Sequence, residues 1–169
     1  MTGVQTCALP ILFGATGGVI EAALRTAAEV ITGKPLENVE FIEVRGMQGL
    51  REAKVEIGDL GLNIAVAHGL GNARKLLESI RKGESKYHAI EIMACPGGCV
   101  GGGGQPYHHG DLEIIKKRTR GIYEIDRSMT IRKSHENPAI KEIYENFLGE
   151  PGSHLAHELL HTSYFERSK

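Results

Sequence analysis

The sequence lacks several features that would quickly assign it to a functional class. Its 169 residues contain no tryptophan, only three cysteines, and nearly equal numbers of basic and acidic side chains, 20 and 21. This balanced charge provides no electrostatic attraction for nucleic acid or for an anionic membrane surface. Three cysteines without regular spacing are also unlike a small secreted domain that is held together by disulfides.

Long apolar stretches are missing as well. No run approaches the roughly 18 apolar residues of a spanning helix, and the first residues lack the basic head and apolar stretch of a signal peptide. With 41% hydrophobic and 24% charged residues, the chain suits one modest globular domain with a buried core. We therefore expect a soluble, cytoplasmic protein that binds neither nucleic acid nor membrane.

The most informative feature that is present is a pair of cysteines among glycines. Cys95 and Cys99 follow an apolar, strand-like run at residues 87–94, and four glycines occupy residues 101–104. Thiolates are soft ligands that favour iron–sulfur clusters, zinc or copper(I). Glycines leave room beside such ligands and expose backbone N–H groups. On spacing alone, a structural disulfide, an inert buried pair and a partial zinc site remain alternatives to a cluster.

The whole string around the cysteines resembles a known motif. Met-Ala-Cys-Pro-Gly-Gly-Cys, followed by Gly-Gly-Gly-Gln-Pro, is similar to the third cluster-binding motif of the iron-iron hydrogenases, enzymes that make or split dihydrogen. The active site of this family is the H-cluster, a 4Fe–4S cubane bridged by a cysteine to a di-iron unit. The resemblance implies that Cys95 is a cubane ligand, that Cys99 is the bridging ligand and that Met93 lies beside the di-iron unit.

A second glycine-rich segment lies near the N-terminus. Phe-Gly-Ala-Thr-Gly-Gly-Val, starting at Phe13, precedes a predicted helix with Thr16 as its N-cap and Gly33 at its end. The same segment is similar to the stretch that passes close to the di-iron site in the hydrogenases. This resemblance implies that Phe13 and Gly14 line the cofactor pocket.

The periodicity of the chain predicts an α/β fold. Alternating apolar and charged residues predict half-buried strands at 39–45 and 53–57, and an apolar run predicts another at 62–67. A helix capped by Asn72 and a strand that leads to Cys95 complete a βαβ unit, with the cysteine at the carboxyl end of the strand. We expect a small mixed or parallel sheet with flanking helices, followed by C-terminal wrapping helices.

Two further helical segments are predicted after the cysteines. The first covers residues 111–129, with the basic residues at 116–120 mostly on a solvated face, and the second begins at Asn137-Pro138. The patterns Asn-Pro-x-Ile, Tyr-x-x-Phe-Leu-Gly and Leu-Leu-His-Thr-x-Tyr resemble the small-subunit segment of the same hydrogenases. The resemblance divides the chain into a stretch outside the family at 1–12, which includes Cys7, a C-terminal lobe of the H-cluster domain at 13–130 and a small-subunit-like segment at 131–169.

A zinc-peptidase pattern occurs in the last helix. His157-Glu158-Leu-Leu-His161 has the spacing with which two histidines bind zinc and a glutamate activates water. Short patterns of this kind also arise by chance, and no third ligand is evident in the sequence. We therefore favour core and capping roles for the two histidines.

The resemblance implies part of a hydrogenase catalytic subunit, most like the multisubunit types linked to NAD(P). Its substrates would be H₂ and protons, and its partners the missing N-terminal part of the subunit and either ferredoxin or NAD(P)-linked electron-transfer subunits. The family's other two cubane ligands and its proton-transfer residues lie in upstream motifs that this sequence lacks. Catalytic residues therefore remain unassigned, and we expect the isolated chain to be inactive. A small iron–sulfur or zinc binding module that uses Cys95 and Cys99 is the main alternative, and a zinc peptidase is a weaker one.

Overall fold

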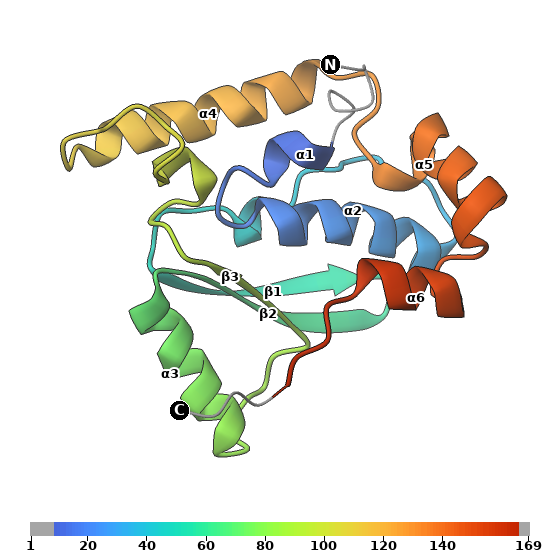
Figure 1. Ribbon diagram of the computed structural model, residues 1–169, viewed down its shortest axis with the longest axis horizontal. Coiled ribbons are helices and arrows are strands. Elements are labelled where there is room, and N and C mark those ends of the chain that lie inside the picture. Colours follow the sequence, from blue (N-terminus) through green and yellow to red (C-terminus); the bar gives the residue numbers. More distant parts are fainter. Residues whose placement is uncertain (1–8, 166–169) are drawn as a thin grey trace. The chain divides into compact units, whose positions relative to one another are not determined.

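The expected α/β fold is present in a computed structural model, which describes residues 9–165 (Figure 1). The chain divides into two compact units after Ser134. None of the helices in the described residues is long and apolar enough to cross a membrane. In order, the elements are α1 (Leu9–Leu12), α2 (Gly18–Thr32), η2 (Ile42–Val44), β1 (Leu50–Ile57), β2 (Leu60–His68), α3 (Leu70–Arg81), β3 (Ala89–Met93), η3 (Cys99–Gly101), α4 (Leu112–Ser128), η4 (Ser134–Glu136), α5 (Pro138–Ile143), η5 (Tyr144–Leu148) and α6 (His154–Leu160).

The sheet is mixed and has the strand order β1-β2-β3. β1 and β2 form an antiparallel hairpin, whose tight turn includes Gly58 with a φ of 57°. β2 and β3 are parallel and are connected by α3, which confirms the predicted βαβ unit. Because β3 is parallel to β2, its carboxyl end is where the chain turns into the cysteine segment.

Helices cover both faces of this sheet (Figure 1). On β2, the side chains of Ile64 and Val66 pack in one core cluster with Leu24 of α2. The alternate residues, Ala65 and Ala67, pack in a second cluster with Leu76 of α3. The two faces of β2 therefore pack against different helices, α2 on one side and α3 on the other.

The strand predicted at residues 39–45 is wrong. In its place lies the short 3-10 helix η2, whose Val44 is fully buried in the core cluster of α2. Two of the charged residues that gave the alternating pattern, Glu40 and Arg45, have partners inside the unit. Arg45 binds Glu21 at 2.6 Å, and Glu40 accepts hydrogen bonds from Arg127 and Arg132. The alternation therefore reflects ion pairing and not one water-facing side of a strand.

Two of the predicted helix caps are also wrong. The N-cap position of α2 is Gly17, with a φ of 89°, and the hydroxyl of Thr16 is buried without a hydrogen-bond partner. The N-cap position of α3 is Gly69, while Asn72 donates a side-chain hydrogen bond to the carbonyl of His68 at 2.9 Å. In both cases a glycine with a positive φ occupies the position that would supply a local capping side chain.

The predicted starts of the two later helices are confirmed, at Asp111 and at Asn137-Pro138. Asp111 accepts a hydrogen bond from the Glu113 amide at the start of α4, and Asn137 accepts one from the Ala139 amide at the start of α5. In the second unit the helix that begins with α5 ends in a π-helical turn, η5, before Gly149. Phe147 in this turn is 63% exposed.

A buried cluster of charges joins α4 to α2. The guanidinium of Arg25 on α2 donates to both carboxylate oxygens of Asp126 on α4, at 2.8 and 2.9 Å, and to Glu21 at 2.9 Å. The side chains of all three residues are fully buried. Burial by itself raises the pKa of Asp126, but hydrogen bonds from Arg25 and Arg132 outweigh it and hold that pKa below its usual value. Paired in this way, the charges hold α4 in one position on α2.

The substitution Asp126→Asn tests this cluster. Removing one partner of a buried ion pair leaves Arg25 incompletely compensated, so we expect the free energy of unfolding to fall by about 3 kcal/mol near neutral pH. Because the pKa of Asp126 is lowered, its stabilising contribution is present above its ordinary value of 3.8 and is lost as the pH falls through the folded-state pKa. Urea unfolding followed by circular dichroism should therefore show a difference that shrinks below about pH 4.

Glu113→Gln is the matched control on the same helix. Glu113 pairs with Lys116 at 2.5 Å, but its side chain is 65% exposed. An exposed pair of this kind contributes less than about 1 kcal/mol. Equal losses in the two variants would contradict the role of the buried cluster.

Candidate functional site

The two cysteines lie in a tight loop that begins where β3 ends. The loop reverses at Gly97 and Gly98, which have φ values of 79° and 97° and thus the left-handed conformation that favours glycine. The Gly98 amide donates to the carbonyl of Cys95 at 3.0 Å, and η3 then begins at Cys99. Cys95 is half-buried, Cys99 is exposed, and both are free thiols, so they are not joined in a disulfide.

The glycines of this loop are required by close contacts. A Cβ atom on Gly98 would lie 2.8 Å from the carbonyl oxygen of Gly14 and 2.9 Å from the Sδ atom of Met93. A Cβ on Gly102 would lie 3.3 Å from the Sγ atom of Cys95. The glycine run therefore passes directly beside the Cys95 thiol and leaves open the space that a side chain would fill.

Residues 13–17, which we call the strap, lie against the cysteine loop. The Val100 amide donates to the carbonyl of Gly14 at 3.0 Å, and the Thr16 amide donates to the carbonyl of Gly97 at 3.1 Å. Phe13 belongs to the same strap, and its side chain is 42% exposed. The structure thus brings together segments that are about 80 residues apart in the sequence and that contain all five predicted site residues.

Arg118 is a site residue that the sequence analysis missed. It belongs to α4, where a solvated basic face is predicted, but its guanidinium donates to the carbonyls of Val100 at 2.9 Å and Pro106 at 2.7 Å. It therefore holds both ends of the glycine run after Cys99. The available signal was its spacing, three residues after the buried Ile115 and four before Ile122, which places it toward the inner side of the helix.

Glu91 is the second residue that was missed. It lies on β3, is 7% exposed, and its two carboxylate oxygens accept hydrogen bonds from the amides of Gly17 at 2.6 Å and Ile20 at 2.8 Å. Burial raises the pKa of Glu91, and the backbone amides oppose that rise. An acidic residue in the middle of an otherwise apolar strand was the signal that could have identified it.

The zinc-peptidase pattern does not form a comparable site. His157 and His161 on α6 are exposed, with ring centroids 4.2 Å apart, and the side chain of Glu158 is 66% exposed. Within residues 9–165, neither histidine belongs to a group of three potential metal ligands. The predicted core role is wrong for both, whereas His161 is the C-cap residue of α6.

The donor set fits part of an iron–sulfur site. Two free thiols, a glycine-lined space beside one of them and a soft thioether at Met93 suit a thiolate-ligated cluster. Clusters of this type are commonly held by four thiolates. The described residues contain no cysteine besides Cys95 and Cys99, and Cys7 lies outside them. The site in this chain therefore offers half of such a ligand set.

Two known protein families match this chain. A family model described as iron only hydrogenase large subunit, C-terminal domain, matches residues 3–103. This match includes residues 3–12, although the resemblance was expected to begin at residue 13. A second model, iron hydrogenase small subunit, matches residues 112–167. Arg118 lies in the second matched region, and the carbonyl of Val100 to which it donates lies in the first.

Individual relatives cover nearly all of the chain. It is 62% identical over 167 residues to the NADP-reducing hydrogenase subunit HndD of Solidesulfovibrio fructosivorans, which covers 99% of this chain and 28% of that protein. A solved structure of a variant of the FeFe-hydrogenase HydA1 from Chlamydomonas reinhardtii matches with a TM-score of 0.68 and 46% identity, over 90% of this chain and 45% of the other. Cytosolic iron-sulfur assembly component 3 of Bos taurus is 36% identical over 89% of this chain and 31% of its own length.

The chain thus corresponds to a part of much longer relatives. The region that the first family model matches contains the strap, the cysteine loop and the three strands that lie between them in the sequence. From its sequence, its structure and the extent of the family match, the chain belongs to the C-terminal domain family of the iron-only hydrogenase large subunit.

Proposed function

We propose that this chain forms one half of a hydrogenase active site, in which Cys95 and Cys99 are ligands of an H-cluster. Cys95 would bind the 4Fe–4S cubane, and Cys99 would bridge it to the di-iron unit. The observation that carries this proposal is the pair of free thiols on a glycine loop that is hydrogen-bonded to the strap. When bound, the cofactor supplies the redox chemistry that interconverts dihydrogen with two protons and two electrons.

The residues of this chain would bind and shield that cofactor. The glycine run leaves space beside the Cys95 thiol, and the strap, which is hydrogen-bonded to the cysteine loop, would cover one side of the bound cofactor. Met93, whose sulfur lies near Gly98, adds a polarizable and apolar neighbour. A low-polarity, partly closed environment of this kind is one means by which proteins adjust the potential of a cluster.

The remaining thiolate ligands would come from polypeptide outside these 169 residues. The two edges of the sheet differ in a way that supports this. β1 exposes Glu52, Lys54 and Glu56, and such charges are typical of an edge strand that faces water. β3, which in the described part of the chain pairs only with β2, exposes Ile92 instead. We infer that further polypeptide of the subunit covers the β3 edge.

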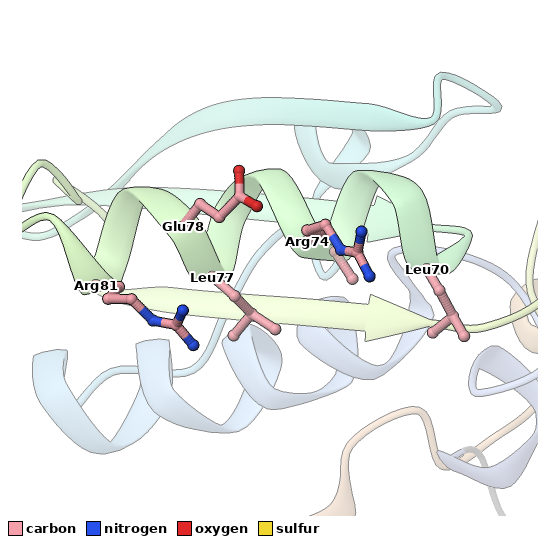
Figure 2. Close-up of a pocket in the computed structure, with 6 residues that line it drawn as sticks. Leu70, Arg74, Leu77, Glu78 and Arg81 are labelled. Atoms are coloured by element: carbon pink, nitrogen blue, oxygen red, sulfur yellow. The ribbon is translucent and has the colours of Figure 1, made fainter.

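A groove on α3 supports the same inference. Leu70 and Leu77, which are 70% and 55% exposed, line an open hollow of about 540 Å³ together with Arg74, Glu78 and Arg81. Figure 2 shows Leu70, Leu77 and Arg81 projecting from the same side of the helix. Apolar side chains so placed are typical of a surface that another part of a protein covers.

The electron-transfer partner would be of the NAD(P)-linked type. This proposal rests on the name of the relative HndD, an NADP-reducing hydrogenase subunit, at 62% identity. Ferredoxin is the alternative partner. Measurement of hydrogen-dependent reduction of each carrier by a complete subunit distinguishes the two.

A second candidate function is iron–sulfur binding without hydrogenase activity. The identity of 36% to cytosolic iron-sulfur assembly component 3 favours it, because a relative with that name shares the same region. Both functions use Cys95 and Cys99. They differ in whether a complete ligand set produces hydrogen.

Metal analysis of cysteine variants tests the proposed ligands. After anaerobic reconstitution with iron and sulfide, we expect Cys95→Ala and Cys99→Ala each to reduce bound iron to background, because a two-thiolate site loses half of its donors. The chain alone should evolve no hydrogen, since its ligand set is incomplete.

His157→Ala is the control for this experiment. It removes an exposed potential ligand from α6 and should leave the iron content unchanged. Zinc that binds to the unchanged chain and is lost in His157→Ala would instead support the peptidase alternative. Robust hydrogen evolution by the isolated chain would contradict the proposal of a half-site.

The role of Arg118 in holding the glycine run is tested separately. Arg118→Ala removes two charge-assisted hydrogen bonds to backbone carbonyls, so hydrogen exchange of the amides of residues 100–105 should accelerate by about tenfold. Arg118→Lys should give an intermediate rate, because an ammonium lacks the planar fork that reaches both carbonyls. Arg120→Ala, at an exposed position on α4, is the matched control, and an equal effect in that variant would argue against the proposed contact.

A further inference from the structure

The cofactor-binding proposal leaves one buried carboxylate without a role. Glu91 lies in the middle of β3, four residues before Cys95, and its side chain crosses to the first turn of α2. The hydrogen bonds at 2.6 and 2.8 Å join residues 74 and 71 positions apart in the chain. A buried carboxylate needs such partners, because without them its charge would be strongly destabilised.

We propose that Glu91 is a positioning residue, which fixes the strap against the cysteine loop so that both line one pocket. The functional meaning of that pocket rests on the proposed cofactor site. The mechanical role of Glu91 does not, since it follows from the contacts of the chain itself.

The need for a distant cap arises from Gly17. A Cβ atom at this position would lie 2.2 Å from the carbonyl oxygen of Val44, and the φ of 89° is strained for any other residue. The position that usually supplies a capping side chain therefore has none, and the preceding Thr16 makes no hydrogen bond through its hydroxyl. The carboxylate of Glu91 takes over this function at the positive end of a 15-residue helix.

The geometry links this cap to the cysteines. Alternation along β3 places Glu91 and Met93 on the same face of the sheet, the one covered by α2. The strap is then held at two places. Its end at Gly17 is bound by β3 through Glu91, and its middle is bound by the loop after β3, through the bonds between Gly14 and Val100 and between Thr16 and Gly97. A strap held at both places has one position relative to Cys95 and Cys99.

A carboxylate suits this task better than an amide. Both oxygens of Glu91 accept hydrogen bonds from backbone amides. In Glu91→Gln, one of these acceptors becomes an NH₂ group that opposes an N–H group, so one contact is lost and two donors face each other. Glu91→Asp keeps the charge but shortens the side chain by one methylene, so it reaches the amides less well.

Hydrogen exchange of the metal-free, 169-residue chain tests the proposal. In Glu91→Gln we expect the amides of Thr16 and Val100 to exchange about tenfold faster, because the charge-assisted cap is lost and the strap opens locally. Amides in the pairing between β1 and β2 should keep their rates. Such a selective change would not result from a loss of overall stability, which would raise all protected rates together.

Two further variants serve as controls. Glu91→Asp should give rates between those of the unchanged chain and Glu91→Gln, and it remains informative if the glutamine variant fails to fold. Glu56→Gln replaces a largely exposed carboxylate on β1 and should change neither amide. Unchanged exchange at Thr16 and Val100 in both Glu91 variants, or a rise that the β2 amides share equally, would overturn the proposal.

Thiol reactivity separates this inference from the proposed function. In the metal-free Glu91→Gln chain, alkylation of the half-buried Cys95 should accelerate as the strap opens. If the strap loosens in this way but no cysteine variant affects iron binding, the cofactor proposal fails and the role of Glu91 stands. If the cysteine variants lose iron while Glu91→Gln leaves the exchange and alkylation rates unchanged, the role of Glu91 fails and the cofactor proposal stands.

Discussion

The site depends on two backbone hydrogen bonds between the strap and the cysteine loop. These bonds, from Thr16 to Gly97 and from Val100 to Gly14, join the backbones of two glycine-containing segments. Because backbone groups make the contact, its geometry depends on how closely the two chains approach. A Cβ on Gly98 would already lie 2.8 Å from strap atoms, so glycine is needed to form the bonds at all. The thiols are thus placed by main-chain packing, with side chains in a supporting role.

Side chains from other elements bind both the strap and the cysteine loop and so support this backbone contact. Glu91 ties the strap to β3, and Arg118 ties the glycine run to α4. α4 itself is held on α2 by the buried contact between Arg25 and Asp126. Glu91, Arg25 and Asp126 are buried charges that are paired through hydrogen bonds, whereas Arg118 is partly exposed. Such contacts add less net stability than their short distances suggest, but their directional geometry favours one arrangement over others.

The two metal-binding patterns of the sequence lie in very different surroundings in the folded chain. Cys95 and Cys99 lie at the carboxyl end of a parallel strand, β3. Their loop is bound by the strap and by Arg118 of α4. His157 and His161 lie on a seven-residue helix, exposed and without further ligands in the described part of the chain. A metal site requires several donors held at fixed positions, so spacing along one helix is insufficient evidence for it.

The sequence by itself determined the βαβ unit, the place of Cys95 at its carboxyl end and the family to which the chain belongs. Hydrophobic periodicity and a long, unusual motif are local properties that can be recognised along the chain. The tertiary structure alone decided that residues 39–45 are not a strand, that Gly17 is capped by Glu91, and that Arg118 faces inward. In each of these cases a charged residue has partners far away in the sequence. Local patterns assign such a residue to the solvent, because its buried partner becomes visible only when distant segments are folded together.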